Sequence, residues 1–321
     1  MTRCRTMLIA GLTLAVLALL TLATSSGVHA AGIEVGNGHS ILADGEKAGT
    51  EAAEKAKAAL GETEAKVVLV FDSVEGGAKG KEAMLKGVAS VFDASITYGC
   101  AAYAPITQDC NTGTVAVLAL GGDVRIAPAV AEVGGDHAAC GKKIGAALKA
   151  VAVPEDAGRV VLLFGACHVP KNNDLVGGVC SVLGEKFPVA GAAAMGDLLY
   201  YQGKVLPQSN LGLMLIGDFT CSFAAKNAPA SEKERVIAVA GEAAAQAVGD
   251  KKATLVLAFD CGGRRGQMGG EIDKELAGMC AAIGDAPLFG FYGSGETGPA
   301  DNDSAPKGVG YHIIICAILG K

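Results

Sequence analysis

The chain of 321 residues contains no tryptophan, and aromatic residues make up only 5% of it. Binding surfaces for sugars are commonly built on exposed aromatic rings, so this composition disfavours them. Glycine, in contrast, occurs 46 times. Because glycine lacks a Cβ, it lets neighbouring backbones approach closely. The composition therefore predicts a fold in which backbones lie unusually close together.

Positive charge is also scarce. Lys and Arg number 27 against 33 Asp and Glu, which gives a net charge of −6, and the basic residues form no cluster. Proteins that bind nucleic acids concentrate Lys and Arg on one face or along one helix. Nucleic acid is therefore not expected as a partner.

The motifs of common cofactors are missing as well. The sequence has no CxxC, HxxH or HExxH pattern, no GxxxxGK[ST] motif, and no GxGxxG opening a helix. We therefore expect no metal site, no phosphate-binding loop and no resident cofactor. Asp301 and Asp303 resemble a calcium loop only loosely, since the glycine and the closing glutamate are absent. A solvated hairpin tip is the better interpretation of those residues.

Long hydrophobic runs are confined to the N-terminus. Arg3 and Arg5 precede an apolar run over residues 7–23, and Val28 and Ala30 suit a cleavage site before residue 31. This pattern predicts a secretory signal peptide over residues 1–30. Retention of the segment as a membrane anchor is the alternative. We expect an exported protein, periplasmic or secreted, with no membrane span once the signal is removed.

Nine cysteines follow residue 30, and they are widely scattered. Several occupy apolar positions, where a free cysteine behaves as a small hydrophobic residue. Export permits disulfides, and Cys100 with Cys110, across an expected hairpin, is the first candidate pair. The odd number leaves at least one thiol unpaired.

Three strongly apolar runs recur along the chain. They end at Phe71, Phe164 and Phe259, which are separated by nearly equal intervals. Each run is followed by a glycine-bearing loop, a segment with helical periodicity and two further strands. A strand and an alanine-rich helix precede each run. The pattern predicts three repeats, over residues 31–123, 124–217 and 218–321.

We therefore expect an α/β fold, in which three pseudo-equivalent strand-helix-strand-helix-strand-strand repeats form one integrated body. Mixed sheets flanked by helices would result, since no linker rich in Pro or Ser separates the repeats. Ser231 and Glu234 predict a capping box for one helix, and Gly249 predicts its end. The helices are expected over residues 46–60, 81–92, 136–151, 174–187, 231–248 and 271–283.

Residues 286–299 are the best-preserved strand end among the three repeats. A short apolar strand over residues 288–292 runs into a glycine-rich turn that carries one carboxylate, Glu296. Glycine in such a turn lets the backbone approach a ligand. A small-molecule site is one interpretation, and a β-hairpin with a solvated glutamate is the other.

The same region resembles a known family. Residues 259–264 read Phe-Asp-Cys-Gly-Gly-Arg, similar to the Phe-x-Cys-x-x-Arg stretch of the FIST sensory-domain family. Residues 290–296 read Gly-Phe-Tyr-Gly-Ser-Gly-Glu, similar to its Gly-Phe-Tyr-x-x-Gly-Glu signature. The N-terminal FIST segment is matched over residues 67–120, although the copy that begins at Gly99 lacks the family's hydroxyls and carboxylate. The middle copy keeps a glycine-acid end at Gly196 and Asp197.

The resemblance implies a ligand-binding input domain that senses small molecules such as amino acids. Residues 31–217 would be the FIST N-like region and residues 218–321 the FIST C-like region. Family members are usually cytoplasmic and joined to signalling outputs. Here a separate signalling partner is expected instead.

Arg264 and Glu296 suggest one specific ligand. A guanidinium clamps a carboxylate through two parallel hydrogen bonds, and a carboxylate binds an ammonium group, so an amino acid would satisfy both. An internal salt bridge from Arg264 to Glu296 or Glu271 is the alternative, and the two are compatible.

Two other functions remain open. Cys261 with His312 as its base would give a hydrolase, and His168 as an axial ligand would give a non-covalent haem protein. We favour a non-catalytic protein that binds a small polar ligand at the glycine-rich strand ends. Its expected ligand-binding residues are Cys261, Arg264, Phe291, Tyr292, Gly295, Glu296, Asp197 and Gly99.

Overall fold

The computed structural model describes Gly32–Lys321, and these residues belong to one compact unit. The predicted signal peptide, residues 1–30, lies outside the described residues. None of the helices between Gly32 and Lys321 has the length and apolar composition needed to cross a bilayer.

The elements follow the predicted repeat. Repeat 1 comprises β1 Ile33–Ser40, α1 Gly45–Leu60, β2 Val67–Asp72, α2 Gly77–Ala89, β3 Thr97–Ala101, β4 Ala104–Thr107 and β5 Val115–Gly122. Repeat 2 comprises β6 Val124–Glu132, α3 His137–Lys149, β7 Gly158–Gly165, α4 Lys171–Leu183, β8 Val189–Ala193, β9 Leu198–Tyr201, β10 Lys204–Pro207 and β11 Ser209–Gly217. Repeat 3 comprises β12 Phe219–Lys226, α5 Lys233–Val248, β13 Ala253–Cys261, α6 Gly262–Met268, α7 Ile272–Ile283, β14 Leu288–Gly293, β15 Glu296–Gly298, β16 Lys307–Val309 and β17 Ile313–Gly320.

The repeats build three mixed sheets of one design. The strand orders are β1-β5-β2-β3-β9-β10, β6-β11-β7-β8-β15-β16 and β12-β17-β13-β14-β4. In each sheet the second and third strands of a repeat pair in parallel, as β2 does with β3, and the other pairings are antiparallel. The expectation of an α/β fold with mixed sheets and flanking helices is confirmed.

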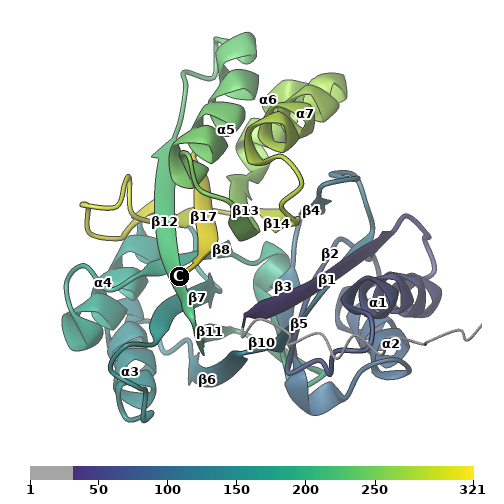
Figure 1. Cartoon of the computed structure of the whole chain (residues 1–321), viewed down its shortest axis with the longest axis horizontal. Helices are drawn as coiled ribbons and strands as arrows, with labels where there is room; N and C mark the ends of the chain where they lie inside the picture. The colour runs from purple at the N-terminus through teal and green to yellow at the C-terminus, as the bar shows by residue number, and fades with distance from the viewer. Residues whose placement is uncertain (1–31) are drawn as a thin grey trace, which may run out of the picture. The chain divides into compact units, whose positions relative to one another are not determined.

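Each repeat also gives strands to the sheet of another repeat. Repeat 1 adds β4 to the third sheet, repeat 2 adds β9 and β10 to the first, and repeat 3 adds β15 and β16 to the second. The exchange is therefore cyclic, and every repeat is tied to both others by backbone hydrogen bonds. Figure 1 shows the three helix pairs, each beside its own sheet.

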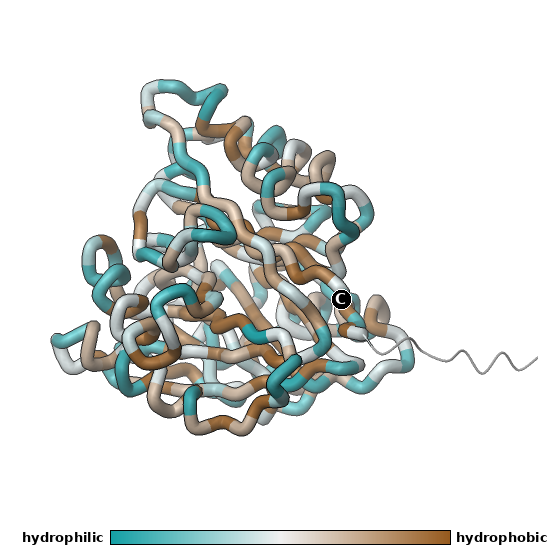
Figure 2. The backbone as a smooth tube through the Cα atoms, turned by 60° about the vertical axis from the view of Figure 1, so that its left-hand side comes forward, coloured by the Kyte–Doolittle hydropathy of each residue, from teal (hydrophilic) through white to brown (hydrophobic). Residues whose placement is uncertain are grey.

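The three marker phenylalanines meet where the sheets face one another. Phe164 lies 5.4 Å from Phe71 and 6.2 Å from Phe259, measured between ring centroids. Alternate residues of the inner strands, such as β2, β7 and β13, face this central core, and the others face the helices, so both faces of these strands are buried. In Figure 2 the hydrophobic stretches accordingly run through the interior while the outer turns are hydrophilic.

Glycines set the distance between the two helices that cover each sheet. A Cβ on Gly49 of α1 would lie 2.2 Å from the Met84 carbonyl oxygen in α2. Gly178 of α4 lies against α3 in the same way, and Gly241 of α5 lies against Gly278 of α7. The abundance of glycine is thus explained in part by close helix crossings, as the composition predicts.

A second set of glycines sits in the third strand of each repeat. Added Cβ atoms on Gly99, Gly191 and Gly290 would lie 1.9, 2.0 and 1.8 Å from a carbonyl oxygen of the adjacent second strand. The three positions are equivalent in the repeats and have the same structural role. Gly99 is therefore needed for strand packing inside the first sheet.

Several local predictions were wrong. The Ser231–Glu234 capping box does not form, because α5 begins after Glu232 and has no side-chain cap, although it ends at Gly249 as predicted. The segment after β13 is the helix α6 and not a loop. Two strands were predicted after the second helix of each repeat, and the exchanged strands β4, β9, β10, β15 and β16 lie between those two.

The Cys100–Cys110 hairpin is also wrong. Cys100 lies in β3, which pairs with β2 and β9, whereas β4 leaves to pair with β14 in another sheet. All nine described cysteines are free thiols. Residues 301–304 do form a tip between the paired strands β15 and β16, with Asp301 and Asp303 exposed, as expected.

Candidate ligand-binding site

A pocket of about 350 Å³ opens where segments of all three repeats come together. Repeat 1 contributes Tyr103, which lies between β3 and β4, repeat 2 the loop after β7, and repeat 3 the ends of β13, β14 and β16. This junction pocket is lined by Tyr103, His168, Val169, Cys261, Gly263, Gly293, Ser294, Gly310 and Tyr311.

Two tyrosines flank the C-terminal end of β13, and the two glycines that follow this strand leave space for their rings. A Cβ on Gly262 would lie 2.4 Å from the Tyr103 ring, and one on Gly263 would lie 3.3 Å from the Tyr311 ring. The Ser294 hydroxyl donates a hydrogen bond to the Tyr103 hydroxyl over 3.3 Å. Tyr311 has a φ of +60°, a strained conformation for a tyrosine that is often found at binding sites.

Cys261 ends β13 and lies at the floor of the junction pocket. The backbone N–H groups of Gly263, Arg264 and Tyr311 lower the pKa of its thiol, but they do not offset the effect of burial. Burial raises the pKa of the Cys261 thiol to about 11, and the neighbouring Glu296 carboxyl adds to the rise. Cys261 is therefore a neutral thiol at pH 7.

Glu296 begins β15 and lies behind Cys261. Its side chain is fully buried, so the alternative of a hairpin with a solvated glutamate is wrong. Oε2 accepts a hydrogen bond from the His312 backbone N–H over 3.0 Å, and Oε1 has no conventional partner among the described residues. Burial raises the pKa of Glu296 to about 8, although the bond from His312 and the contact with the Cys261 thiol favour the charged form.

Behind the pocket a buried ionic cluster fixes α6 against the sheet. Arg264 donates to Asp260 through Nε over 2.6 Å and to Glu275 of α7 through Nη2 over 2.5 Å. The Tyr292 hydroxyl donates to the other oxygen of Glu275 over 2.8 Å. We call Asp260, Arg264, Glu275 and Tyr292 the Arg264 cluster; none of its side chains is exposed. Burial raises the pKa of Glu275 well above its usual range, and the Asp260 carboxylate contributes to this.

The predicted partners of Arg264 need correction. Neither Glu296 nor Glu271 pairs with it: Glu271 forms surface salt bridges with Lys233 and Lys274. The sequence places Asp260 four residues before Arg264, one helical turn away, but the helix itself was not predicted. Arg264 has only Nη1 left without a partner, so it supports the pocket from behind.

The other predicted ligand-binding residues are spread over the fold. Tyr292 lies in the Arg264 cluster, and Phe291 lies in the central core, 4.4 Å from the Phe71 ring. Gly295, with a φ of +138°, lies against Val169 at the pocket wall. Asp197 is exposed in a separate turn, and Gly99 packs on β2.

The two histidines considered as functional residues, His168 and His312, lie in different places. His168 lines the junction pocket. His312 turns its Nδ1 toward the Gly310 carbonyl oxygen at 2.8 Å and lines a separate hollow, so it does not line the junction pocket with Cys261. Within Gly32–Lys321 no group of three or more His, Cys, Asp or Glu side chains is arranged to hold a metal ion.

The sequence did not indicate Tyr103 or Tyr311, because both follow strand ends that carry no charge pattern. It also missed a second buried ionic group in repeat 1. Asp72 receives hydrogen bonds from Lys81, over 2.5 Å, and from the Tyr200 hydroxyl, and none of the three is exposed. The signal was the position of Asp72, directly after Phe71, where repeat 3 has Asp260 after Phe259.

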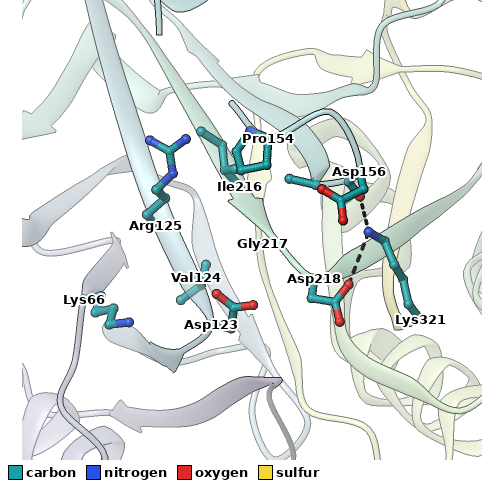
Figure 3. A pocket seen from close by; sticks show the side chains of 11 residues that line it. Lys66, Asp123, Val124, Arg125, Pro154, Asp156, Ile216, Gly217, Asp218 and Lys321 are labelled. Carbon is teal, nitrogen blue, oxygen red and sulfur yellow. Dashed lines mark hydrogen bonds and ion pairs between the residues drawn. The ribbon is translucent and has the colours of Figure 1, made fainter. Parts of the chain in front are cut away.

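A larger hollow of about 390 Å³ lies where the repeats join end to end. Figure 3 shows its charged lining, with Lys321 between Asp156 and Asp218. Its cations are already engaged: Lys66 donates to Gly122, Arg125 to Ala152, and Lys321 pairs with Asp218 at 3.2 Å. The junction pocket is lined by Tyr311, whose buried hydroxyl has no partner, whereas no described lining residue of the charged hollow has a buried side-chain nitrogen or oxygen without a partner.

Comparison with protein-family models identifies the family of the chain. The model described as FIST N domain matches residues 66–243, more than half of the chain, and the FIST C domain matches residues 228–299. The chain belongs to the FIST family. The resemblance drawn from the strand-end motifs is therefore confirmed. FIST domains are generally sensory, ligand-binding domains.

No curated protein matches this FIST protein. Among solved structures, a crystal structure of cyanuric acid hydrolase from A. caulinodans is similar, with 12% sequence identity and a TM-score of 0.45. The similarity covers 90% of this chain and 100% of that one.

Proposed function

We propose that this FIST protein binds a small polar molecule in the junction pocket and acts as a sensor or ligand-capturing protein, without catalysing a reaction. The observation that carries the proposal is a concentration of unsatisfied polar atoms. Of the eight buried side-chain polar atoms without a partner in the described part, five lie near the end of β13: Asp260 Oδ2, Arg264 Nη1, Arg265 Nε, Glu296 Oε1 and Tyr311 Oη. Tyr311 lines the pocket, and the other four atoms belong to residues outside its lining. Buried polar groups normally have partners, which a ligand or ordered water would supply.

The arrangement also supports a ligand with both apolar and polar parts. Tyr103 and Val169 are exposed at the rim, with 46% and 39% of their surface accessible. Ser294, Tyr311 and Cys261 present polar groups deeper in the pocket. A ligand would therefore place its apolar part between Tyr103 and Val169 and its hydrogen-bonding groups toward β13.

An amino acid is one ligand of this kind, and it makes a distinct prediction. Its ammonium group would require Glu296 to lose the proton that it holds at pH 7. Calorimetric titration in two buffers of different ionisation enthalpy measures this proton release. Release of about one proton supports an amine ligand, and no release supports a neutral or carboxylate ligand.

A thermal-shift screen of amino acids, small organic acids and haem tests the function itself, because a ligand specific to the native state raises the melting temperature. The effect of a hit should be reduced in Tyr311→Phe and Ser294→Ala. It should be unchanged in Asp156→Asn, which alters the charged hollow of Figure 3. A hit that depends on Asp156 and not on Tyr311 would contradict the proposal.

We propose in addition that the protein acts outside the cytoplasm and passes its signal to a separate partner. The support is the charged, apolar and small-residue pattern of residues 3–30. Cell fractionation and N-terminal sequencing of the purified protein test this. A mature N-terminus at residue 31 is expected, and recovery of the uncleaved chain in the cytoplasm would contradict it.

A further inference from the structure

The lining of the junction pocket contains no aspartate, glutamate, lysine or arginine. Of the residues that line it, only His168 can gain a positive charge near neutral pH, and its side chain is exposed. Burial raises the pKa of the Cys261 thiol to about 11 and also raises the pKa of the Tyr311 hydroxyl. Both groups are therefore neutral at pH 7.

The charged side chains around the end of β13 are occupied outside the pocket. Arg264 pairs with Asp260 at 2.6 Å, and the Arg265 guanidinium lies over the Tyr292 ring at 5.8 Å. Burial raises the pKa of Glu296 to about 8, so this carboxyl holds its proton at pH 7. An ion that enters the pocket would lose its hydration without gaining a partner of opposite charge, which is costly. The pocket therefore favours an uncharged ligand.

Aromatic rings and bare backbone form much of the pocket wall. Tyr103 and Tyr311 both line it, and three further positions are the glycines Gly263, Gly293 and Gly310. The Tyr311 ring lies over Gly263, where an added Cβ would be 3.3 Å from it. Aromatic rings make favourable offset-stacked or edge-to-face contacts with one another, and a flat ligand can approach a backbone that carries no Cβ. This wall suits a planar aromatic group.

Two tyrosine hydroxyls of the lining have a proton to donate. The Tyr311 hydroxyl is buried and has no partner among the described residues. The Tyr103 hydroxyl accepts a hydrogen bond from Ser294 over 3.3 Å, which leaves its own proton for another acceptor. A buried donor without a partner costs free energy, and a carbonyl oxygen on the ligand would satisfy it.

We propose that the ligand of the junction pocket is an uncharged aromatic carbonyl compound, such as an aryl amide or an aryl ketone. Its carbonyl oxygen accepts a hydrogen bond from the Tyr311 hydroxyl, and its ring packs against Tyr103 and Val169 at the rim. This inference rests on the proposed function and selects, among the ligands which that function allows, those that carry no charge. A free amino acid, which is a zwitterion at pH 7, does not belong to this class.

Benzamide, benzoate and benzamidine test the charge of the ligand, because they share one shape and differ in charge at pH 7. Saturation-transfer NMR on the purified protein gives their dissociation constants. Benzamide should bind at least about tenfold more tightly than either ion, because a buried ion without a partner is costly. Cyclohexanecarboxamide, which keeps the amide and lacks the aromatic ring, should bind about threefold more weakly than benzamide.

Tyr311→Phe tests the position of the carbonyl group. The substitution removes a hydroxyl that has no partner among the described residues, so the fold should tolerate it. Benzamide should bind about fivefold more weakly to this variant, whereas toluene, which has the ring and no carbonyl, should bind equally to both proteins. Tyr201→Phe is the matched control, because Tyr201 does not line the pocket, and it should leave benzamide binding unchanged.

Four results would overturn the inference while leaving the proposed function intact. The first is an absence of benzamide binding. The second is tighter binding of benzoate than of benzamide that is reduced in His168→Gln, which would show that the pocket takes anions. The third is equal weakening of benzamide and toluene in Tyr311→Phe. The fourth is a charged hit from the thermal-shift screen that depends on Tyr311 and Ser294. Benzamide binding that depends on Asp156 and not on Tyr311 would overturn both.

Discussion

Arg264 and Glu275 form an ion pair in which Nη2 and Oε1 lie 2.5 Å apart and neither side chain is exposed. Removing one partner of a buried pair leaves an uncompensated charge, which costs more than the pair contributes. Arg264→Met should therefore lower the free energy of unfolding by about 3–5 kcal/mol, measured by urea denaturation.

Arg265→Met is the matched control. Arg265 follows in the same helix and contacts the Tyr292 ring at 5.8 Å, a contact expected to contribute about 0.5–1 kcal/mol. Equal losses in the two variants would show that the Arg264 cluster has no special role in stability.

Two adjacent glycines of α4 should respond to alanine in opposite directions. A Cβ on Gly178 would lie 2.3 Å from the Ala138 carbonyl oxygen of α3, whereas a Cβ on Gly177 meets nothing within 4 Å. Gly177→Ala should stabilise the protein by about 0.5–1 kcal/mol, because alanine favours the helix. Gly178→Ala should destabilise it by at least about 1–3 kcal/mol, because the helices must separate. Stabilisation by both substitutions, in thermal melts, would contradict the close helix crossing.

Glu296 should make stability depend on pH. Its folded pKa of about 8 lies above the ordinary value of 4.5, so the folded state holds the proton more tightly than the unfolded state. This contribution is complete below about pH 4.5 and is lost as the pH rises to 8. Between these values Glu296 should lower the free energy of unfolding by up to about 1.4 kcal/mol per pH unit.

Glu296→Gln should flatten that profile when unfolding is measured in urea between pH 5 and pH 8. Glu271→Gln is the control. Surface salt bridges with Lys233 and Lys274 lower the pKa of Glu271 to about 2, so its contribution is constant above about pH 5. A profile that Glu296→Gln leaves unchanged would mean that the carboxyl is ionised in the folded protein at pH 7.

The Asp72–Lys81 pair predicts a rescue. Lys81→Met leaves the buried Asp72 carboxylate without its cation and should cost about 3–5 kcal/mol. Adding Asp72→Asn removes the unpaired charge and should restore at least about 1 kcal/mol, because the Asn oxygen can still accept from the Val74 N–H. Additive losses in the double variant would show that the two side chains are not coupled.

The local sequence pattern was sufficient to predict most helices and strands. The α3 helix begins after Asp136, whose side chain accepts from the Ala139 N–H, within a residue of the prediction. The helix α6 was missed because its sequence contains three glycines and no apolar stripe. It is held by tertiary contacts of Arg264, which local propensity does not register.

The sequence by itself determined that the chain is built three times from one strand-and-helix plan, because both-face apolar strands and alanine-rich helices recur with the same spacing. It also determined that a short apolar strand, β14, is followed by a glycine-rich turn that carries Glu296. Only the tertiary structure decided which residues meet there. Tyr103 of repeat 1, His168 of repeat 2 and Cys261 of repeat 3 line one pocket because short strands such as β4 and β15 cross to other sheets. Such strands have three or four residues, too few for a recognisable hydrophobic pattern. Their partner strands are far away in the sequence, and the backbone hydrogen bonds between them form only in the folded protein.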